Sequence, residues 1–209
     1  RSPLNCGAVF SNGGHDALAI LGSYTGEALV LKTLANGSPA FDRQITLHKN
    51  AIKGIACNKN LFFSVCADTS VAIHSTADFS CVRHVPQSHS RIANGCVALS
   101  NGNFASISRD KKLRIWSSNL KVRSFDTPHT HSIKCISTSE NHRYLATGSY
   151  NGLVCVFDLQ EEKWVFQKRF TSHGISSLCS ISQSNSKFLA SSYDGNIYEF
   201  EIPGVAHDT

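Results

Sequence analysis

Histidine, serine and aspartate recur together along this chain, and residues of these three types can form a hydrolytic catalytic triad. The fullest set is His89, Ser108 and Asp110, followed by Trp116. Partial copies follow it, and they contribute His129, Asn151 and Asp194. Because a hydrolase needs one triad whereas this set recurs in series, we interpret these residues as a structural network. In such a network, His and Ser hydrogen-bond to an acid that would otherwise be buried at a large cost.

Motifs of other enzyme classes are missing from the sequence. It has no G-x-S-x-G elbow, no phosphate-binding glycine loop, no H-E-x-x-H motif and no paired carboxylates outside turns. None of the eight cysteines forms a C-x-x-C pair, so zinc and redox sites lack their usual spacing. We therefore expect a protein that is not an enzyme and that has no metal and no cofactor.

The cysteines are spaced in a way that favours reduced thiols. Cys57, Cys96, Cys135 and Cys179 each fall in the first apolar run of a successive segment. We expect this repeated position to give a repeated environment, in which a free thiol packs as a small buried apolar group. Reduced thiols are typical of an intracellular compartment, and we expect the protein in the cytoplasm or nucleus.

A tight-turn signal sets the period of the chain. It returns every 41 to 43 residues, with central residues Thr25, Asp68, Asp110, Asn151 and Asp194. Between the turns lie short runs rich in Val, Ile and Phe and bounded by Gly, Asn, Asp and Ser, which are typical of strands. No long segment has a helical apolar stripe. We therefore expect an all-β chain with four strands in each repeat.

A period of about 40–45 residues is typical of propeller blades, and the turns together with His89, Ser108, Asp110 and Trp116 resemble the WD40-repeat family. The resemblance implies a WD40-type β-propeller with about five visible four-stranded blades and a buried His–Ser–Asp–Trp network. It also implies that N-terminal blades are missing and that the whole ring has six or seven blades. The repeats are expected over roughly residues 1–44, 45–86, 87–126, 127–168 and 169–209.

The copies of this network differ from one another. In the second repeat Cys66 takes the place of the hydroxyl residue and His74 that of the Trp. Phe157 takes the Trp position in the fourth repeat, and Thr171 stands where the fifth would have its His. The resemblance nevertheless covers essentially the whole chain.

The charge of the chain is mildly basic, with a formal net charge of +5. Six basic residues fall within fifteen positions, namely Arg109, Lys111, Lys112, Arg114, Lys121 and Arg123. Such residues can block edge-to-edge strand pairing or face an acidic or phosphorylated partner, with nucleic acid as a weaker third option. The sequence has no apolar run of about 18 residues, and we expect no membrane span.

The resemblance implies that partners bind the loop face of the propeller, where the residue before each central turn residue is exposed. Four of these five positions hold Tyr24, Arg109, Tyr150 and Tyr193, and Tyr and Arg are the residue types that dominate interface energetics. Loop residues Arg91, His131 and His173 are expected to join them. We therefore predict a protein–protein interaction scaffold that binds a protein or peptide, as a subunit of a larger complex. The alternative is a propeller that binds RNA through its basic and Tyr residues.

Overall fold

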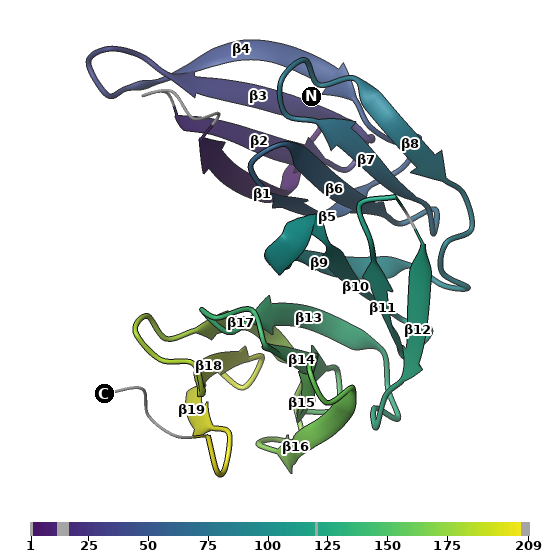
Figure 1. Cartoon of the computed structure of the whole chain (residues 1–209), viewed down its shortest axis with the longest axis vertical. Helices are drawn as coiled ribbons and strands as arrows, with labels where there is room; N and C mark the ends of the chain where they lie inside the picture. The colour runs from purple at the N-terminus through teal and green to yellow at the C-terminus, as the bar shows by residue number, and fades with distance from the viewer. Residues whose placement is uncertain (1, 12–16, 120, 206–209) are drawn as a thin grey trace. The chain divides into compact units, whose positions relative to one another are not determined.

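The computed structural model describes residues 2–11, 17–119 and 121–205 (Figure 1). These residues form nineteen β-strands and one 3-10 turn, η1 (Ser100–Gly102), and the described part of the chain has no α-helix. The predicted all-β fold is confirmed. Within the described residues, no helix has the length and apolarity needed to cross a membrane.

The strands follow one another along the chain in five groups, each of which forms one sheet in which neighbours in sequence are hydrogen-bonded. The first two groups are β1 (Leu4–Ser11), β2 (Ala17–Ser23), β3 (Glu27–Thr33) and β4 (Pro39–Thr46), then β5 (Ile52–Cys57), β6 (Leu61–Cys66), β7 (Val71–Ser75) and β8 (Cys81–Val85). The third is β9 (Ala93–Ala98), β10 (Phe104–Ser108), β11 (Lys112–Trp116) and β12 (Val122–Asp126). The fourth and fifth are β13 (Ile133–Thr138), β14 (Tyr144–Ser149), β15 (Leu153–Asp158) and β16 (Lys163–Arg169), then β17 (Ile175–Ser180), β18 (Lys187–Ser192) and β19 (Ile197–Glu201).

Four of these sheets have the four strands that the period predicts, and the fifth has three in the described part of the chain. The pairings β1–β2, β5–β6, β13–β14 and β17–β18 are antiparallel, and each has a register shift near the start of its first strand. A residue inserted at such a bulge bends the strand and increases its twist. The same irregularity therefore recurs in four sheets, as expected for a structural repeat.

The turn between the second and third strands has the same backbone in all five sheets. The residue after the predicted central residue has a positive φ in each, at Gly26 (91°), Thr69 (75°), Lys111 (64°), Gly152 (78°) and Gly195 (87°). Glycine adopts this left-handed conformation without steric cost, which explains why it occupies three of the five positions. A Cβ atom on Gly152 would lie 2.0 Å from the Thr171 carbonyl oxygen. This turn therefore packs tightly on the loop that leads to the next sheet.

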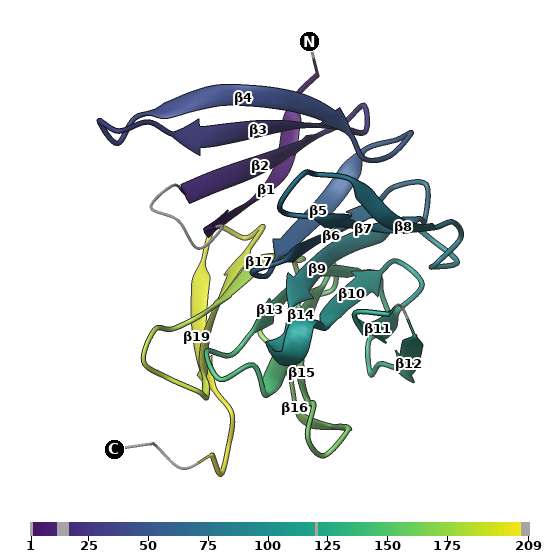
Figure 2. The same cartoon turned by 45° about the horizontal axis from the view of Figure 1, so that its top comes forward.

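The chain divides into two compact units, one of residues 1–106 with 116–121 and the other of residues 107–115 with 122–209. In the first unit, one buried cluster joins the first and second sheets, which lie side by side in Figures 1 and 2, and another joins the second sheet to β9, β10 and Trp116. In the second unit, a cluster joins the fourth and fifth sheets. Sheets of each unit thus pack face to face through apolar side chains.

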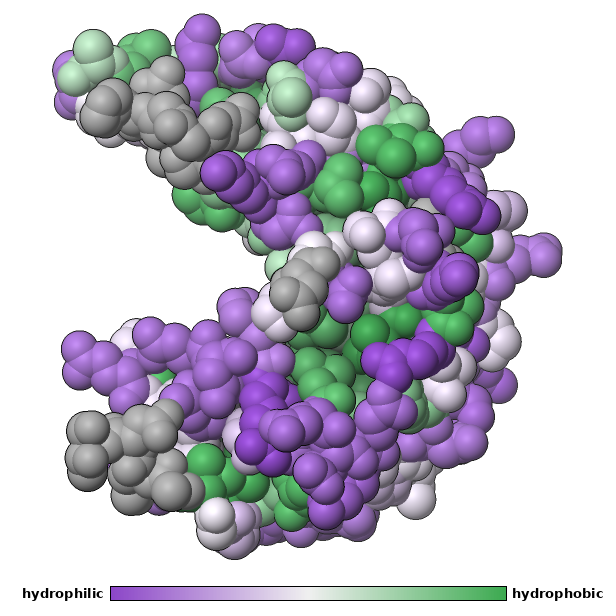
Figure 3. Space-filling view, in the orientation of Figure 1, coloured by the Kyte–Doolittle hydropathy of each residue, from purple (hydrophilic) through white to green (hydrophobic). Residues whose placement is uncertain are grey.

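The fourth strand of each four-stranded sheet is mainly exposed, whereas the central strands β6, β14 and β15 are buried almost throughout. In Figure 3 the region of β13–β19 shows mostly hydrophilic side chains with smaller apolar patches among them. This pattern follows from the polar outer strands and turns of the sequence.

All eight cysteines are free thiols, as expected. Their environments are not repeated, however. Cys57 pairs with Phe62, Cys135 with Gly148 and Cys179 with Leu189, which are different registers of the first strand, and Cys179 is exposed. The prediction of one repeated environment is wrong because the cysteines lie at different positions along their strands. Cys57 lies on the opposite face from Cys135 and Cys179, and Cys179 lies two pairs further along its strand than Cys135.

Candidate functional site

The network of the third sheet is centred on a different serine from the predicted one. His89 Nε2 is hydrogen-bonded to Ser106 Oγ at 2.8 Å, and Trp116 Nε1 donates to the same oxygen at 2.8 Å. All three side chains are buried. Ser108, the predicted member, accepts the backbone N–H of Asp110 at 3.0 Å. Residues two apart in a strand share a face, so the sequence pattern identified the face but not the residue.

The same two-residue correction applies to the second and fourth sheets. His48 Nε2 is bonded to Ser64 Oγ at 2.8 Å, and His129 Nε2 to Thr147 Oγ1 at 2.9 Å. Asn151, predicted to share the network of His129, is bonded instead to Ser149 and to the Thr130 hydroxyl. The predicted link between His129 and Asn151 is therefore wrong.

Burial decides the protonation of these histidines. It lowers the pKa of His48 and of His129 to about 4, because removal from water penalises the charged imidazolium. Both rings are thus neutral at pH 7. Their partners are hydroxyls that join one strand or loop to another, which is the structural role predicted from the repetition.

The turn acids of the third and fifth sheets bind side chains of their own sheets. Asp110 pairs with Arg114 at 2.8 Å, and both side chains are largely buried. Asp194 has a pKa held well below its usual range by hydrogen bonds, first from the Thr171 hydroxyl and also from Tyr198. Arg114 and Tyr198 were not predicted as partners. Each lies four residues after its acid, and this spacing is the signal that could have identified them.

Turns and loops alternate along one edge of the second unit. Thr127 Oγ1 donates to the Lys111 carbonyl at 2.8 Å, and the Tyr150 N–H donates to Ser132 at 3.2 Å. Further along, the Phe170 N–H donates to Gly152 and the Tyr193 N–H to Gly174, both at 3.0 Å. These bonds hold three turns and two loops side by side. The predicted binding residues on them form what we call the rim: Arg109, His131, Tyr150, His173 and Tyr193.

The rim exposes its aromatic and basic side chains. Tyr150 is 40% and Tyr193 57% exposed, and neither phenol hydroxyl has a hydrogen-bond partner among the described residues. Arg109 is exposed, and no acid in the described part of the chain pairs with it. His131 and His173 are exposed in the two loops, each within 3.5 Å of the hydroxyl of its preceding residue. Arg109 and the two phenol hydroxyls thus offer the rim unpaired hydrogen-bond donors, and the tyrosines add apolar rings.

Gly174 sets the spacing of the two rim tyrosines. A Cβ atom at this position would lie 3.0 Å from Cδ2 of Tyr193 and 3.2 Å from the backbone oxygen of Tyr150. A larger residue would have to displace the Tyr193 ring. This residue was not predicted from the sequence, because the contact joins turns of neighbouring sheets that are 43 residues apart in the chain.

The first unit contains the other two predicted binding residues. Tyr24 is 49% exposed, and the Lys53 ammonium lies 5.3 Å from the centre of its ring, a cation–π distance. Arg91 is exposed in the loop between β8 and β9. Ala67, which takes the Tyr position in the second sheet, is half-buried. Tyr24 therefore differs from the rim tyrosines in having a cationic neighbour.

One group of side chains in the described residues could hold a metal ion. The possible ligand atoms of His48, Cys66 and Asp68 all lie within 4.8 Å of one another. A hollow of about 670 Å³ lies elsewhere, on the first sheet, where its lining includes Leu4, Glu27 and Leu29. The rim and the metal-ligand group belong to different units.

Comparison with known proteins gives three similarities. Residues 120–158 and 164–200 match the family described as WD domain, G-beta repeat. Over 108 residues, the chain is 32% identical to E3 ubiquitin-protein ligase COP1 of Arabidopsis thaliana. The matched segment covers 51% of this chain and 16% of that protein. The crystal structure of the RRP9 WD40 repeats superposes on this chain with a TM-score of 0.80 and 20% sequence identity. The match covers 94% of this chain and 61% of the chain in that crystal structure. The chain thus spans a small part of the plant relative's length and less than two thirds of the chain in the RRP9 crystal structure.

Proposed function

We propose that this chain, a member of the WD40-repeat family, is a scaffold whose protein partner binds the rim of the second unit. The WD40 propeller fold generally mediates protein–protein interaction and is typically not enzymatic. The ligase activity in the name of the plant relative belongs to that whole protein, of which the matched part is 16%. The eight free thiols support a place in the cytoplasm or nucleus.

The observation that carries this proposal is the state of Tyr150 and Tyr193. Both rings are substantially exposed, and both hydroxyls lack a partner within the described chain. A tyrosine combines a large apolar face with a polar tip, and it loses little conformational entropy when it is covered. Gly174 lies close to both the Tyr193 ring and the Tyr150 backbone, so the two turns that present these rings are held together as an anchor for a partner.

The partner is expected to present carboxylate or phosphate groups. Arg109 offers a guanidinium that can bind such groups through two parallel hydrogen bonds. The nearby acid Asp194 is already bonded by Thr171, Asn196 and Tyr198, so that its charge is largely compensated. An acidic or phosphorylated peptide segment therefore fits the rim better than a basic one.

The test is affinity purification with the full-length protein and its Tyr150→Ala and Tyr193→Ala variants. Loss of a buried tyrosine anchor costs about 2 kcal/mol, roughly a thirtyfold loss of affinity. Partner recovery should fall accordingly, while the unfolding curves stay unchanged. Ile197→Ala is the matched control, because Ile197 is 70% exposed on β19 and is not part of the rim. Partner recovery that is equal in all variants would refute the assignment of the rim.

Variants of the rim residues also distinguish a protein partner from a nucleic-acid partner. RNA capture that falls steeply with salt and is lost in Arg109→Ala would assign the rim to nucleic acid instead. A protein partner retained by the wild type after nuclease treatment, and lost in Tyr193→Ala, would support the scaffold.

A further inference from the structure

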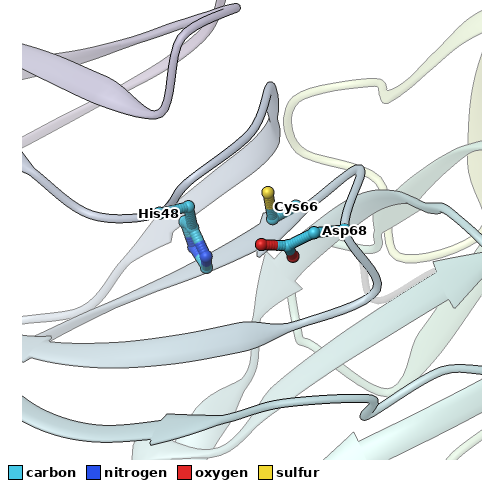
Figure 4. Close-up of side chains that lie close together, drawn as sticks. All are labelled: His48, Cys66 and Asp68. Atoms are coloured by element: carbon cyan, nitrogen blue, oxygen red, sulfur yellow. The ribbon is translucent and has the colours of Figure 1, made fainter.

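Three side chains of different chemistry meet at one end of the second sheet (Figure 4). His48 lies in the loop before β5, Cys66 ends β6, and Asp68 lies in the turn between β6 and β7. Figure 4 shows the Asp68 carboxylate turned toward His48, with Cys66 next to Asp68. We propose that these three residues bind a zinc ion. This site is independent of the rim.

The three donors are the ones that zinc prefers. Zinc binds imidazole nitrogen, thiolate sulfur and carboxylate oxygen, and with three protein ligands it keeps a fourth position for water. Bond lengths of about 2.0–2.3 Å place tetrahedral donors about 3.3–3.8 Å apart. Because the three donor atoms already lie within 4.8 Å of one another, movements of about 1 Å bring them to these distances. Side-chain rotation in a turn and a loop can supply such movements.

Two serines orient the imidazole. His48 Nε2 is 2.8 Å from Ser64 Oγ, and Nδ1 is 2.9 Å from Ser70 Oγ, which also bonds Asp68 Oδ1 at 2.5 Å. Nδ1 is thus the nitrogen on the Asp68 side of the ring. Without metal, Ser70 Oγ donates to Asp68 and accepts the Nδ1–H of His48. Metal binding at Nδ1 moves the ring proton to Nε2, where Ser64 Oγ accepts it once its hydroxyl rotates.

The thiol of Cys66 is already turned toward a polar atom. Its Sγ donates to the Asn50 carbonyl at 3.2 Å. Zinc binding exchanges this hydrogen bond for a metal–sulfur bond and releases the thiol proton.

The thiol of Cys66 stands where the other copies of the repeat have a hydroxyl. Cys66 pairs with Ile52, the residue before the register shift in the second sheet. At the same register the first, fourth and fifth sheets place serine, namely Ser23, Ser149 and Ser192. Among these sheets, the second alone combines a loop histidine, a thiol and a turn acid at these positions.

The carboxylate of Asp68 also differs from the other turn acids. Asp110 binds Arg114 and Asp194 binds Tyr198, each four residues further along the chain. The residue four positions after Asp68 is Ala72, which offers no polar side chain. Asp68 is exposed, whereas His48 and Cys66 are buried. Its outer oxygen is therefore accessible to an ion that enters from solvent.

The test is a cobalt titration of the full-length reduced protein, followed by zinc competition. Cobalt takes zinc sites, and a bound thiolate gives a charge-transfer absorption band that zinc removes. We expect this band, with one ion bound, in the wild type and in Cys81→Ser. Cys81 is the matched control, because it is an exposed thiol of β8 in the same sheet. Cys66→Ser should lose the band, and Asp68→Asn should lose most of the affinity.

The residues at the same position in the other sheets indicate that Cys66→Ser will fold. Serine occupies the position of Cys66, two residues before the central turn residue, in the other four sheets. Cys66→Ser should therefore unfold at nearly the same temperature as the wild type. A wild type without a thiolate band, or a band that survives in Cys66→Ser, would overturn the site.

Discussion

The second and fourth sheets contain the same buried bond in two different settings. In the second, His48 Nε2 lies 2.8 Å from Ser64, and in the fourth, His129 Nε2 lies 2.9 Å from Thr147. Burial lowers the pKa of both histidines to about 4. The histidine–hydroxyl bond is therefore the constant part of the repeat.

The turns of these two sheets differ. The second sheet has Cys66 and Asp68, whereas the fourth has Ser149 and Asn151, which bond each other without a charge. The fourth sheet places its acid at Asp158, the last residue of β15, where Arg143 donates to it at 2.7 Å. The bond from the histidine to the second strand does not involve the turn, so the turn residues can differ between copies, and in the second sheet they supply possible metal ligands.

The third-strand aromatic position differs as well. Phe157 is buried against Phe125 and Trp164, with ring centres 4.9 and 5.1 Å apart. The corresponding His74 stacks on Phe62 at 4.8 Å, and its Nδ1 is buried without a hydrogen-bond partner. The fourth sheet thus has an apolar ring where the second has an unsatisfied polar one.

The largest expected effect is at this aromatic position. Phe157→Ala should lower the free energy of unfolding by about 3–5 kcal/mol, because it removes a ring that is 1% exposed and leaves a cavity. His74→Phe, the reverse exchange, should raise it by about 1 kcal/mol by removing the unpaired nitrogen. Urea unfolding of both variants measures these values. A destabilised His74→Phe would show that the second sheet requires the imidazole.

A smaller effect is expected at the hydroxyls. Thr147→Val should cost about 2 kcal/mol, because His129 would then have neither ring nitrogen bonded. Ser64→Ala should cost about 1 kcal/mol, since His48 keeps its bond to Ser70. Equal costs in urea unfolding would contradict the view that Ser70 supports His48.

The last expected effect is a change in the pH dependence of stability. The pKa of His74 is lowered by burial to about 4, so the folded ring stays neutral while the unfolded one takes up a proton below its ordinary value of 6.5. Stability is therefore full above about pH 6.5 and is lost as the pH falls toward 4, by up to about 1.4 kcal/mol per pH unit for each such histidine. In urea unfolding at several pH values, His74→Phe should lose less stability than the wild type as the pH falls, because one titrating histidine has been removed. Parallel slopes would show that His74 does not titrate as a neutral buried group.

Much of the fold could be predicted from local pattern. The turn period and the apolar runs predicted five repeated sheets, and the positive φ after each central turn residue agrees with the glycines seen in the sequence. The rim position was also predicted from the turn, although binding at the rim stays a prediction. Arg114 and Gly174 were missed, because their contacts depend on side-chain direction and on the next sheet.

By itself, the sequence determined the repeat, the all-β class and the set of buried histidines, because these follow from periodicity and composition within about forty residues. Only the tertiary structure decided which hydroxyl each histidine meets, since Ser64 and Cys66 lie on the same strand face two residues apart. It also brought His48 next to Cys66 and Asp68, and placed the Tyr193 ring and the Tyr150 backbone on Gly174. These contacts join turns and loops that are distant in sequence, and spacing alone does not specify them.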